Sequence, residues 1–208
     1  MCPEAIDDGC WTDTLPFARA PFRRIFPAAV LVLAAQFSGQ ALASDYAPTS
    51  YVPAVQFGYG NDDKHHIDKY EVVFRWDSGH AWGNPEGWLL GLGYEMNVAY
   101  WHSTASDHPQ SPWEIGAAPV LTLGWHRYDW IPFVEASIGV RLLTATRTSE
   151  SHEFSTAFQF GEYLGAGVAF GKDMRFAVGY RFQHISNGGI KQPNPGTTFN
   201  TVYVRYRF

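Results

Sequence analysis

The feature that most constrains this chain is a period-two alternation of apolar and polar residues. It recurs in segments of about ten residues, separated by polar and glycine-rich turns, a pattern typical of outer-membrane β-barrels. Between Tyr70 and Trp76, for example, aromatic and aliphatic residues alternate with Glu71 and Arg75. Successive side chains of a strand point to opposite faces, so each such segment has one apolar face and one more polar face.

An apolar run over residues 25–35 follows several arginines and precedes a small-residue pattern at 41–43. This arrangement predicts a secretory signal peptide over residues 1–43. The acidic residues ahead of the arginines are unusual in such a leader and suggest a true start downstream of Met1. Both cysteines, Cys2 and Cys10, fall in the leader, so we expect residues 44–208 to form no disulfide.

Beyond the leader no apolar run reaches the roughly 18 residues that a membrane-spanning helix needs. The alternating segments lie near residues 51–60, 67–77, 88–100, 113–125, 134–142, 155–171, 174–186 and 198–208. We therefore expect an all-β protein, with residues 44–208 forming a single eight-stranded antiparallel transmembrane β-barrel in the bacterial outer membrane. With both termini in the periplasm, the outer loops are expected at 61–66, 102–112, 147–154 and 187–196.

Two further features concern the lumen and the C-terminus. An eight-stranded barrel is just wide enough for side chains to fill, so inward-facing charges are expected to pair with one another. These residues are Glu71, Glu95, Glu135, Arg75, Arg141, Arg175, Arg181 and Arg205. The chain ends with apolar residues at alternate positions up to Phe208, the kind of signal that the outer-membrane assembly machinery reads. A net charge of -5 offers no basic field for nucleic acid.

One polar pair falls on the apolar face. In the seventh segment, His184 and Ser186 continue the lipid-facing row of Phe176, Val178, Tyr180 and Phe182. The sixth segment carries Glu162 in its own apolar row. If the hairpin closes through 172–174, Glu162 lies directly opposite His184, within reach of a carboxylate–imidazole hydrogen bond. The alternative is that these groups simply lie among the lipid headgroups.

A serine, a histidine and a carboxylate in one row have the composition of an esterase site. Ser186 is then the nucleophile, His184 the general base and Glu162 the orienting acid. The backbone amides of Asn187, Gly188 and Gly189 are candidates for binding the oxyanion, because glycines allow close approach of the chain.

The run from His184 to Gly196, together with Gly165-Ala166-Gly167 and the eight-segment layout, resembles the lipid A 3-O-deacylase family of outer-membrane enzymes. The resemblance covers essentially residues 44–208. It implies a Ser-His-acid site on the outer wall of the barrel, hydrolysis of the acyl ester at position 3 of lipid A, and no cofactor. Lipid A, or lipopolysaccharide, is the implied partner.

One position departs from the family pattern, because Thr198 stands where the resemblance implies the acid. We expect Glu162 to take over that role; the alternatives are a slow enzyme or a barrel that is not an active deacylase. Two other classes stay open: a non-enzymatic structural or adhesive barrel, and another lipid acyl hydrolase or transferase. The loop histidines have no spacing typical of metal ligands, so no metal is expected. The sequence leaves homo-oligomerisation open.

Overall fold

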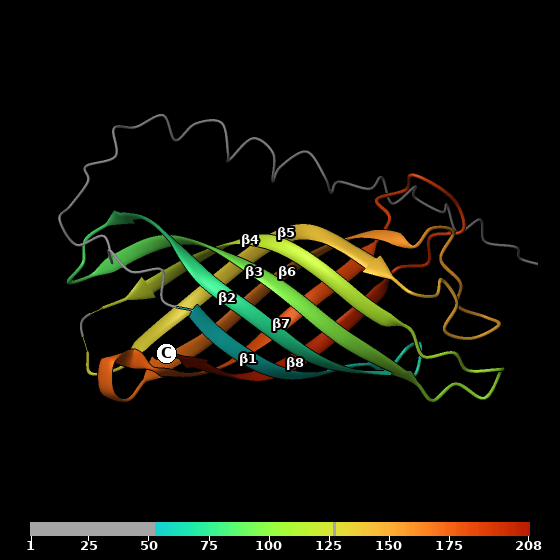
Figure 1. Ribbon diagram of the computed structural model, residues 1–208, viewed down its shortest axis with the longest axis horizontal. Coiled ribbons are helices and arrows are strands. Elements are labelled where there is room, and N and C mark those ends of the chain that lie inside the picture. The colour runs from blue at the N-terminus through green and yellow to red at the C-terminus, as the bar shows by residue number, and fades with distance from the viewer. Residues whose placement is uncertain (1–52, 127) are drawn as a thin grey trace, which may run out of the picture. The chain divides into compact units, whose positions relative to one another are not determined.

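The computed structural model describes residues 53–126 and 128–208, which form eight antiparallel strands closed into a barrel (Figure 1). Each strand pairs with its neighbour in sequence, and the first strand pairs with the last to close the barrel. The strands are β1 (Pro53–Asp62), β2 (Ile67–Gly83), β3 (Trp88–Ser103), β4 (Trp113–Trp125), β5 (Ile131–Leu143), β6 (Phe158–Phe170), β7 (Phe176–Ser186) and β8 (Thr197–Arg207). The predicted fold class is confirmed.

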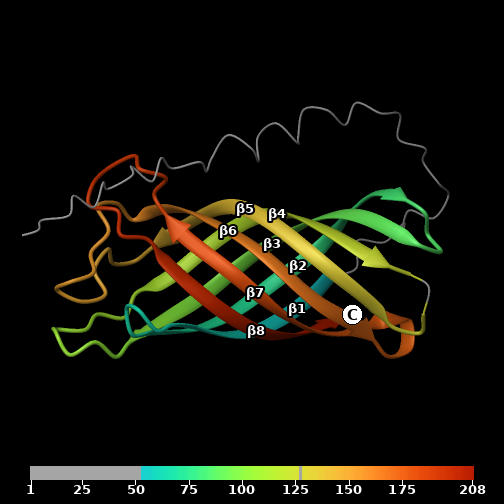
Figure 2. The same ribbon diagram turned by 180° about the vertical axis from the view of Figure 1, so that it is seen from behind.

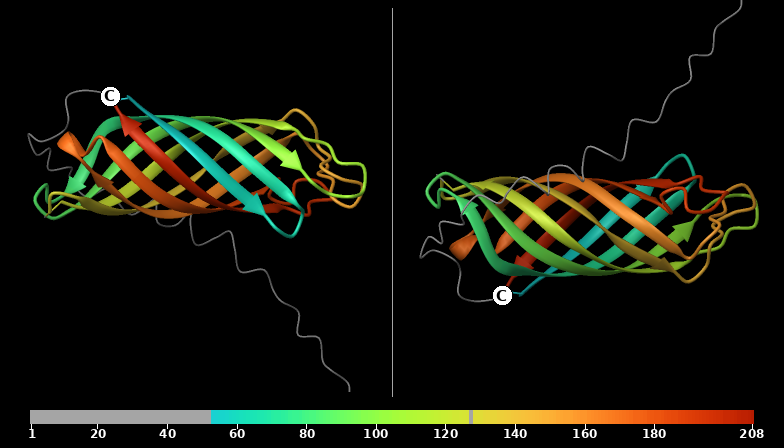
Figure 3. Two further views of the ribbon diagram at one scale, coloured as in Figure 1. Left: turned by 90° about the horizontal axis from the view of Figure 1, so that it is seen from below. Right: turned by 90° about the horizontal axis from the view of Figure 1, so that it is seen from above.

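The two ends of the barrel differ. The connections after β1, β3, β5 and β7, residues 63–66, 104–112, 144–157 and 187–196, gather at one end, here called the loop end (Figures 2 and 3). The C-terminus lies at the opposite end, here called the terminal end, beside the short η1 helix (Lys172–Met174). The predicted loop limits at 61 and 154 were wrong: Asn61 and Asp62 still pair with β2, and β6 begins only at Phe158. The predicted leader, residues 1–43, lies outside the described residues.

The alternation in the sequence corresponds to side chains that point into the lumen and side chains that point outward. Along β7, Ala177, Arg181 and Gln183 are buried in the lumen, whereas Val178 and Phe182 are exposed on the outer wall. The exposed apolar side chains of the other strands form a continuous belt, as expected for a surface that faces lipid. Within the described residues, no helix has the length and apolar character needed to span a membrane.

Charged side chains pair inside the barrel. Glu135 accepts hydrogen bonds from Arg75 (2.7 Å), Arg181 (2.9 Å) and Arg205 (3.0 Å), and Arg181 also bonds to Glu95 (3.1 Å). Buried charges are tolerated when they are paired and hydrogen-bonded in this way. The predicted network is therefore present.

Arg175 is the exception among the predicted lumen charges. It lies at the end of η1, its side chain is 46% exposed, and its nearest acid is Asp173 at 3.9 Å. Arg175 lines the open terminal end of the lumen, but it pairs with Asp173 and not with the buried carboxylates, so the prediction that it joins the internal charge network was wrong.

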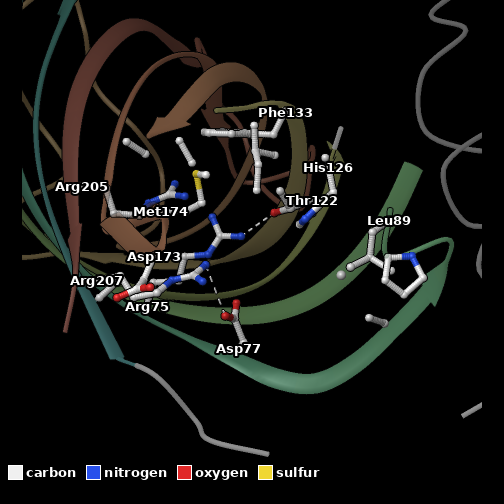
Figure 4. Close-up of a pocket in the computed structure, with 18 of the residues that line it drawn as sticks. Arg75, Asp77, Leu89, Thr122, His126, Phe133, Asp173, Met174, Arg205 and Arg207 are labelled. Carbon is white, nitrogen blue, oxygen red and sulfur yellow. Dashed lines mark hydrogen bonds and ion pairs between the residues drawn. The ribbon is translucent and has the colours of Figure 1, made fainter. Parts of the chain in front are cut away.

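The two ends of the lumen are filled differently. At the loop end a cluster of buried apolar side chains closes the interior: Ile67, Ala99, Trp101, Leu143, Phe154, Ile185 and Phe199. At the terminal end a cavity of about 730 Å³ remains, lined in part by Arg75, Asp77 and His126 (Figure 4). Burial and the nearby charge of Arg207 lower the pKa of His126.

Candidate active site

The polar pair of β7 lies at the loop end of the outer wall. Strand β7 places His184 and Ser186 on the same outer face as Phe182. The alternating residues Gln183 and Ile185 point to the other face and are buried. Both polar residues are partly exposed. A histidine and a serine thus lie where the apolar belt gives way to the loops.

The neighbouring strands place one polar residue on each side of His184. In the strand register, Glu162 of β6 and Thr198 of β8 are both directly opposite His184. The predicted register of the β6–β7 hairpin, with Phe170 opposite Phe176, is confirmed. Glu162, His184 and Thr198 therefore form one transverse row on the outer wall.

The side-chain contact of His184 is with Thr198. Its Nδ1 lies 3.1 Å from Oγ1 of Thr198. A hydrogen bond on one ring nitrogen fixes the ring orientation and leaves the other nitrogen free for a second partner. Thr198, which stands where the resemblance implies the acid, thus contacts His184. The sequence predicted Glu162 as the orienting residue; strand parity puts Thr198 on the outer face but does not predict its hydrogen bond to His184.

The loop after Ser186 is organised around the buried Asn187. Its amide group donates to Oγ of Ser155 (2.9 Å) and to the carbonyl of Lys191 (2.8 Å), while its side-chain oxygen accepts from the N–H of Gly189 (2.9 Å). The backbone N–H of Asn187 donates to Asn194 (3.0 Å). The amides of Asn187 and Gly189 are therefore engaged within the loop.

Gly188 differs from its two neighbours. Its backbone N–H points to Oγ of Ser186, at 3.4 Å. Of the three amides considered from the sequence, the amide of Gly188 is thus the one directed at the serine. Sequence reasoning missed Asn194 and Ser155, although the Pro-Asn-Pro-Gly turn that contains Asn194 is visible in the sequence.

The end of the same loop covers the histidine ring. Gly196 has a φ of +70°, and a Cβ atom at this position would lie 2.7 Å from Cε1 of His184. The carbonyl of Gly196 accepts a hydrogen bond from Nε2 of His152, at 3.0 Å. Burial and the neighbouring His65 lower the pKa of His152, which favours the neutral ring. Only a glycine fits between His184 and this buried histidine.

An apolar groove of about 600 Å³ runs along the outer wall beside the serine. The strand register joins them in one row: Ser186 is opposite Phe160, followed across the next strands by Val140, Ala117 and Met96. At the usual spacing between strands, this row extends about 19 Å from the serine. Met96 lies near the middle of β3, so the groove leads from the loop end into the apolar belt.

Comparison with known proteins gives consistent matches. The model of the family described as Lipid A 3-O-deacylase (PagL) matches residues 68–207. A Lipid A deacylase PagL of Bordetella bronchiseptica is 30% identical over 161 residues, covering 77% of this chain and 85% of the relative. One of Pseudomonas aeruginosa is 27% identical over 136 residues, covering 65% and 76%. The chain belongs to the lipid A 3-O-deacylase (PagL) family.

A solved structure agrees with this membership. A crystal structure of the outer membrane enzyme PagL superposes with a TM-score of 0.65 and 25% sequence identity, covering 74% of this chain and 99% of that chain. Family membership and the apolar belt place the protein in the bacterial outer membrane. Among the described residues, no three His, Cys, Asp or Glu side chains converge in a way that could hold a metal ion.

Proposed function

We propose that this protein hydrolyses the ester-linked acyl chain at position 3 of lipid A, with Ser186 as nucleophile and His184 as general base. The observation that carries the proposal is the polar row of Glu162, His184 and Thr198 beside Ser186, at the loop end of an outer wall whose middle is largely apolar. Polar side chains on a lipid-facing surface are costly and are typically functional. Membership of the PagL family names the substrate.

The reaction follows from the groups present. Ser186 Oγ bonds to the ester carbonyl carbon as its proton passes to the free ring nitrogen of His184. The tetrahedral oxyanion is stabilised by the backbone N–H of Gly188, which is directed at Ser186, whereas the N–H groups of Asn187 and Gly189 are engaged within the loop. Collapse of this intermediate releases the lipid A hydroxyl, which takes the proton from His184. A water molecule then hydrolyses the acyl-enzyme by the same route and releases the fatty acid.

Two neighbours support the imidazole in different ways. Thr198 orients the ring through Nδ1, at 3.1 Å. Glu162, opposite His184 on β6, supplies a negative charge next to the imidazolium that forms in the reaction. We therefore retain Glu162 as the acid of the site and assign the orienting hydrogen bond to Thr198.

The outer groove supports the choice of an acyl substrate. It is apolar, starts at Phe160 beside Ser186, and descends into the belt. An acyl chain that lies in it keeps its carbonyl at the loop end and its tail among lipid tails. The site thus reaches a membrane ester without extracting the lipid from the bilayer. Phe208, exposed at the terminal end, is proposed as the contact for the assembly machinery.

Mass spectrometry of lipid A tests the proposal. Cells of a Gram-negative host that express the wild-type chain should lose one 3-hydroxyacyl group from lipid A, and the Ser186→Ala variant should leave lipid A unmodified. Tyr180→Phe is the matched control, because it removes another outward hydroxyl of β7 and should retain activity. Heat-modifiable electrophoretic mobility shows that each variant forms a barrel. Equal lipid A masses with and without Ser186 would instead favour a non-enzymatic barrel.

A further inference from the structure

The carboxylate of Asp62 lies at the loop end of β1, only 4% exposed. One oxygen, Oδ1, accepts the backbone N–H groups of Lys64 (3.0 Å) and His65 (3.1 Å) and so caps the β1–β2 turn. The other oxygen, Oδ2, contacts Nδ1 of His65 (2.7 Å) and accepts the backbone N–H of Thr198 (2.9 Å). The turn is thus capped by one oxygen, and the bond to Thr198 is additional.

The bond to Thr198 joins the first and last strands where their backbone pairing has ended. The β1–β8 register stops at Asn61 opposite Asn200, two residues short of Thr198. Beyond that point the side chain of Asp62 continues the connection. The start of β8 is therefore held on its β1 side by this carboxylate and on its β7 side by pairing with His184.

Thr198 links the restraint on its own backbone to the side chain of His184. Its backbone N–H bonds to Asp62, and its hydroxyl contacts Nδ1 of His184. A β-branched side chain has restricted χ1 freedom, so a fixed backbone at Thr198 also fixes the position of its hydroxyl. Two hydrogen bonds in series thus connect a buried carboxylate on β1 to the imidazole on β7.

We propose that Asp62 is a positioning residue of the esterase site, acting through Thr198 to hold His184 in the orientation that accepts the proton of Ser186. This inference rests on the function proposed above. It explains how a chain with a threonine where the resemblance implies an acid keeps its histidine oriented: a backbone hydrogen bond anchors the threonine, and the threonine hydroxyl contacts the ring.

A second set of contacts leads from Asp62 to the same ring. The ring of His65, bonded to Asp62, lies 4.0 Å from the ring of His152 between centroids. His152 in turn bonds to the carbonyl of Gly196, which covers His184. This second series passes through a ring-to-ring contact between His65 and His152, whereas the series through Thr198 consists of hydrogen bonds, so the orienting connection is assigned to Thr198.

A double-mutant cycle on the full-length protein with lipid A as substrate tests the proposal. Thr198→Val removes the hydroxyl at nearly constant volume and should lower kcat about tenfold with KM unchanged, the size expected for one hydrogen bond. Thr198→Ser keeps the hydroxyl and should retain most of kcat. Asp62→Asn keeps an oxygen for the turn amides but presents an N–H group to Thr198, and should also lower kcat about tenfold.

The double variant separates positioning from general structural damage. Because both substitutions break the same connection, Asp62→Asn with Thr198→Val should lose about tenfold in kcat, not the roughly hundredfold of independent sites. Asp63→Asn is the matched control: it removes a carboxylate from the same turn, but Asp63 is exposed and bonds only to Asn61 among the described residues, so kcat should be unchanged.

Three outcomes would overturn the inference. These are multiplicative losses in the double variant, wild-type kcat in Asp62→Asn, or equal kcat in Thr198→Val and Thr198→Ser. Should Asp62→Asn fail to form a barrel, the two Thr198 variants decide, since their comparison needs no change at Asp62. The Ser186→Ala variant distinguishes this failure from a failure of the proposed function. If Ser186→Ala retains activity, the esterase assignment is wrong. If Ser186→Ala is inactive but the Asp62 and Thr198 variants keep the wild-type kcat, only the positioning role is wrong.

Discussion

The lumen and the outer wall of this barrel use polar residues in opposite ways. Inside, the charged groups are paired several at a time, with three guanidinium groups on the carboxylate of Glu135 alone. Outside, among the described residues, the side chain of His184 makes one hydrogen bond, to Thr198, and no hydrogen bond or ion pair joins it to Glu162. The charges bonded to Glu135 are buried, and buried charges are tolerated when they are paired with one another.

Under the proposed function, this contrast separates structural residues in the lumen from catalytic residues on the outer wall. A lumen carboxylate fully occupied by arginines has nothing left for a substrate. An outward serine and histidine contribute little to the barrel and remain available for reaction. We therefore expect substitutions in the lumen to lower stability and substitutions in the outer row to lower turnover.

The largest effect is expected from Glu135→Ala. Removing this carboxylate leaves Arg75, Arg181 and Arg205 without their common partner in the lumen, and breaking such a buried pairing costs about 3–5 kcal/mol. Urea titration of folded and unfolded protein in lipid vesicles measures the free energy of unfolding. Glu162→Gln, on the outer wall, serves as the comparison and should leave that free energy unchanged. Equal stability of both variants would contradict the division between lumen and wall.

Glu162→Gln should instead lower kcat by about 10- to 100-fold, because a carboxylate that supports a cationic ring contributes about 1.5–3 kcal/mol. The assay is deacylation of lipid A by the purified barrel. Asp68→Asn is the control, as it removes a carboxylate at the loop end of β2, hydrogen-bonded to Tyr59 and far along the sheet from β7. Unchanged turnover in Glu162→Gln would leave Thr198 as the residue that supports His184 and would remove Glu162 from the site.

The smallest effect is expected from Gly196→Ala. The added Cβ would lie 2.7 Å from Cε1 of His184 and would displace the ring, lowering kcat about tenfold. Gly79→Ala is a close control, since Gly79 has a φ of +78° and no atom within 4 Å of its would-be Cβ. It carries the same left-handed strain at a distance from the site and should leave turnover unchanged. Similar turnover in both variants would show that Gly196 does not restrain the histidine.

The sequence could predict features that depend on one strand or on one short hairpin. The side on which a residue lies follows from strand parity, so the outward placement of His184 and Ser186 could be read from alternation. The register of β6 against β7 follows from a short hairpin, which placed Glu162 opposite His184. Parity could not show that Arg175, just before β7, pairs with Asp173 at the open end of the lumen and stays outside the buried network.

The contacts that orient His184 could not be predicted in this way. Asp62 and Thr198 are 136 residues apart, and they meet only because β1 closes against β8. Alternation says which face a residue occupies but not which distant strand end lies beside it.

By itself, the sequence determined the barrel, the outward serine and histidine, and the carboxylate across from them. The tertiary structure decided which group holds the histidine, because barrel closure brings the two ends of the chain together and puts a buried carboxylate beneath Thr198. A pattern of period two is a property of single strands, whereas this contact depends on the closed sheet as a whole.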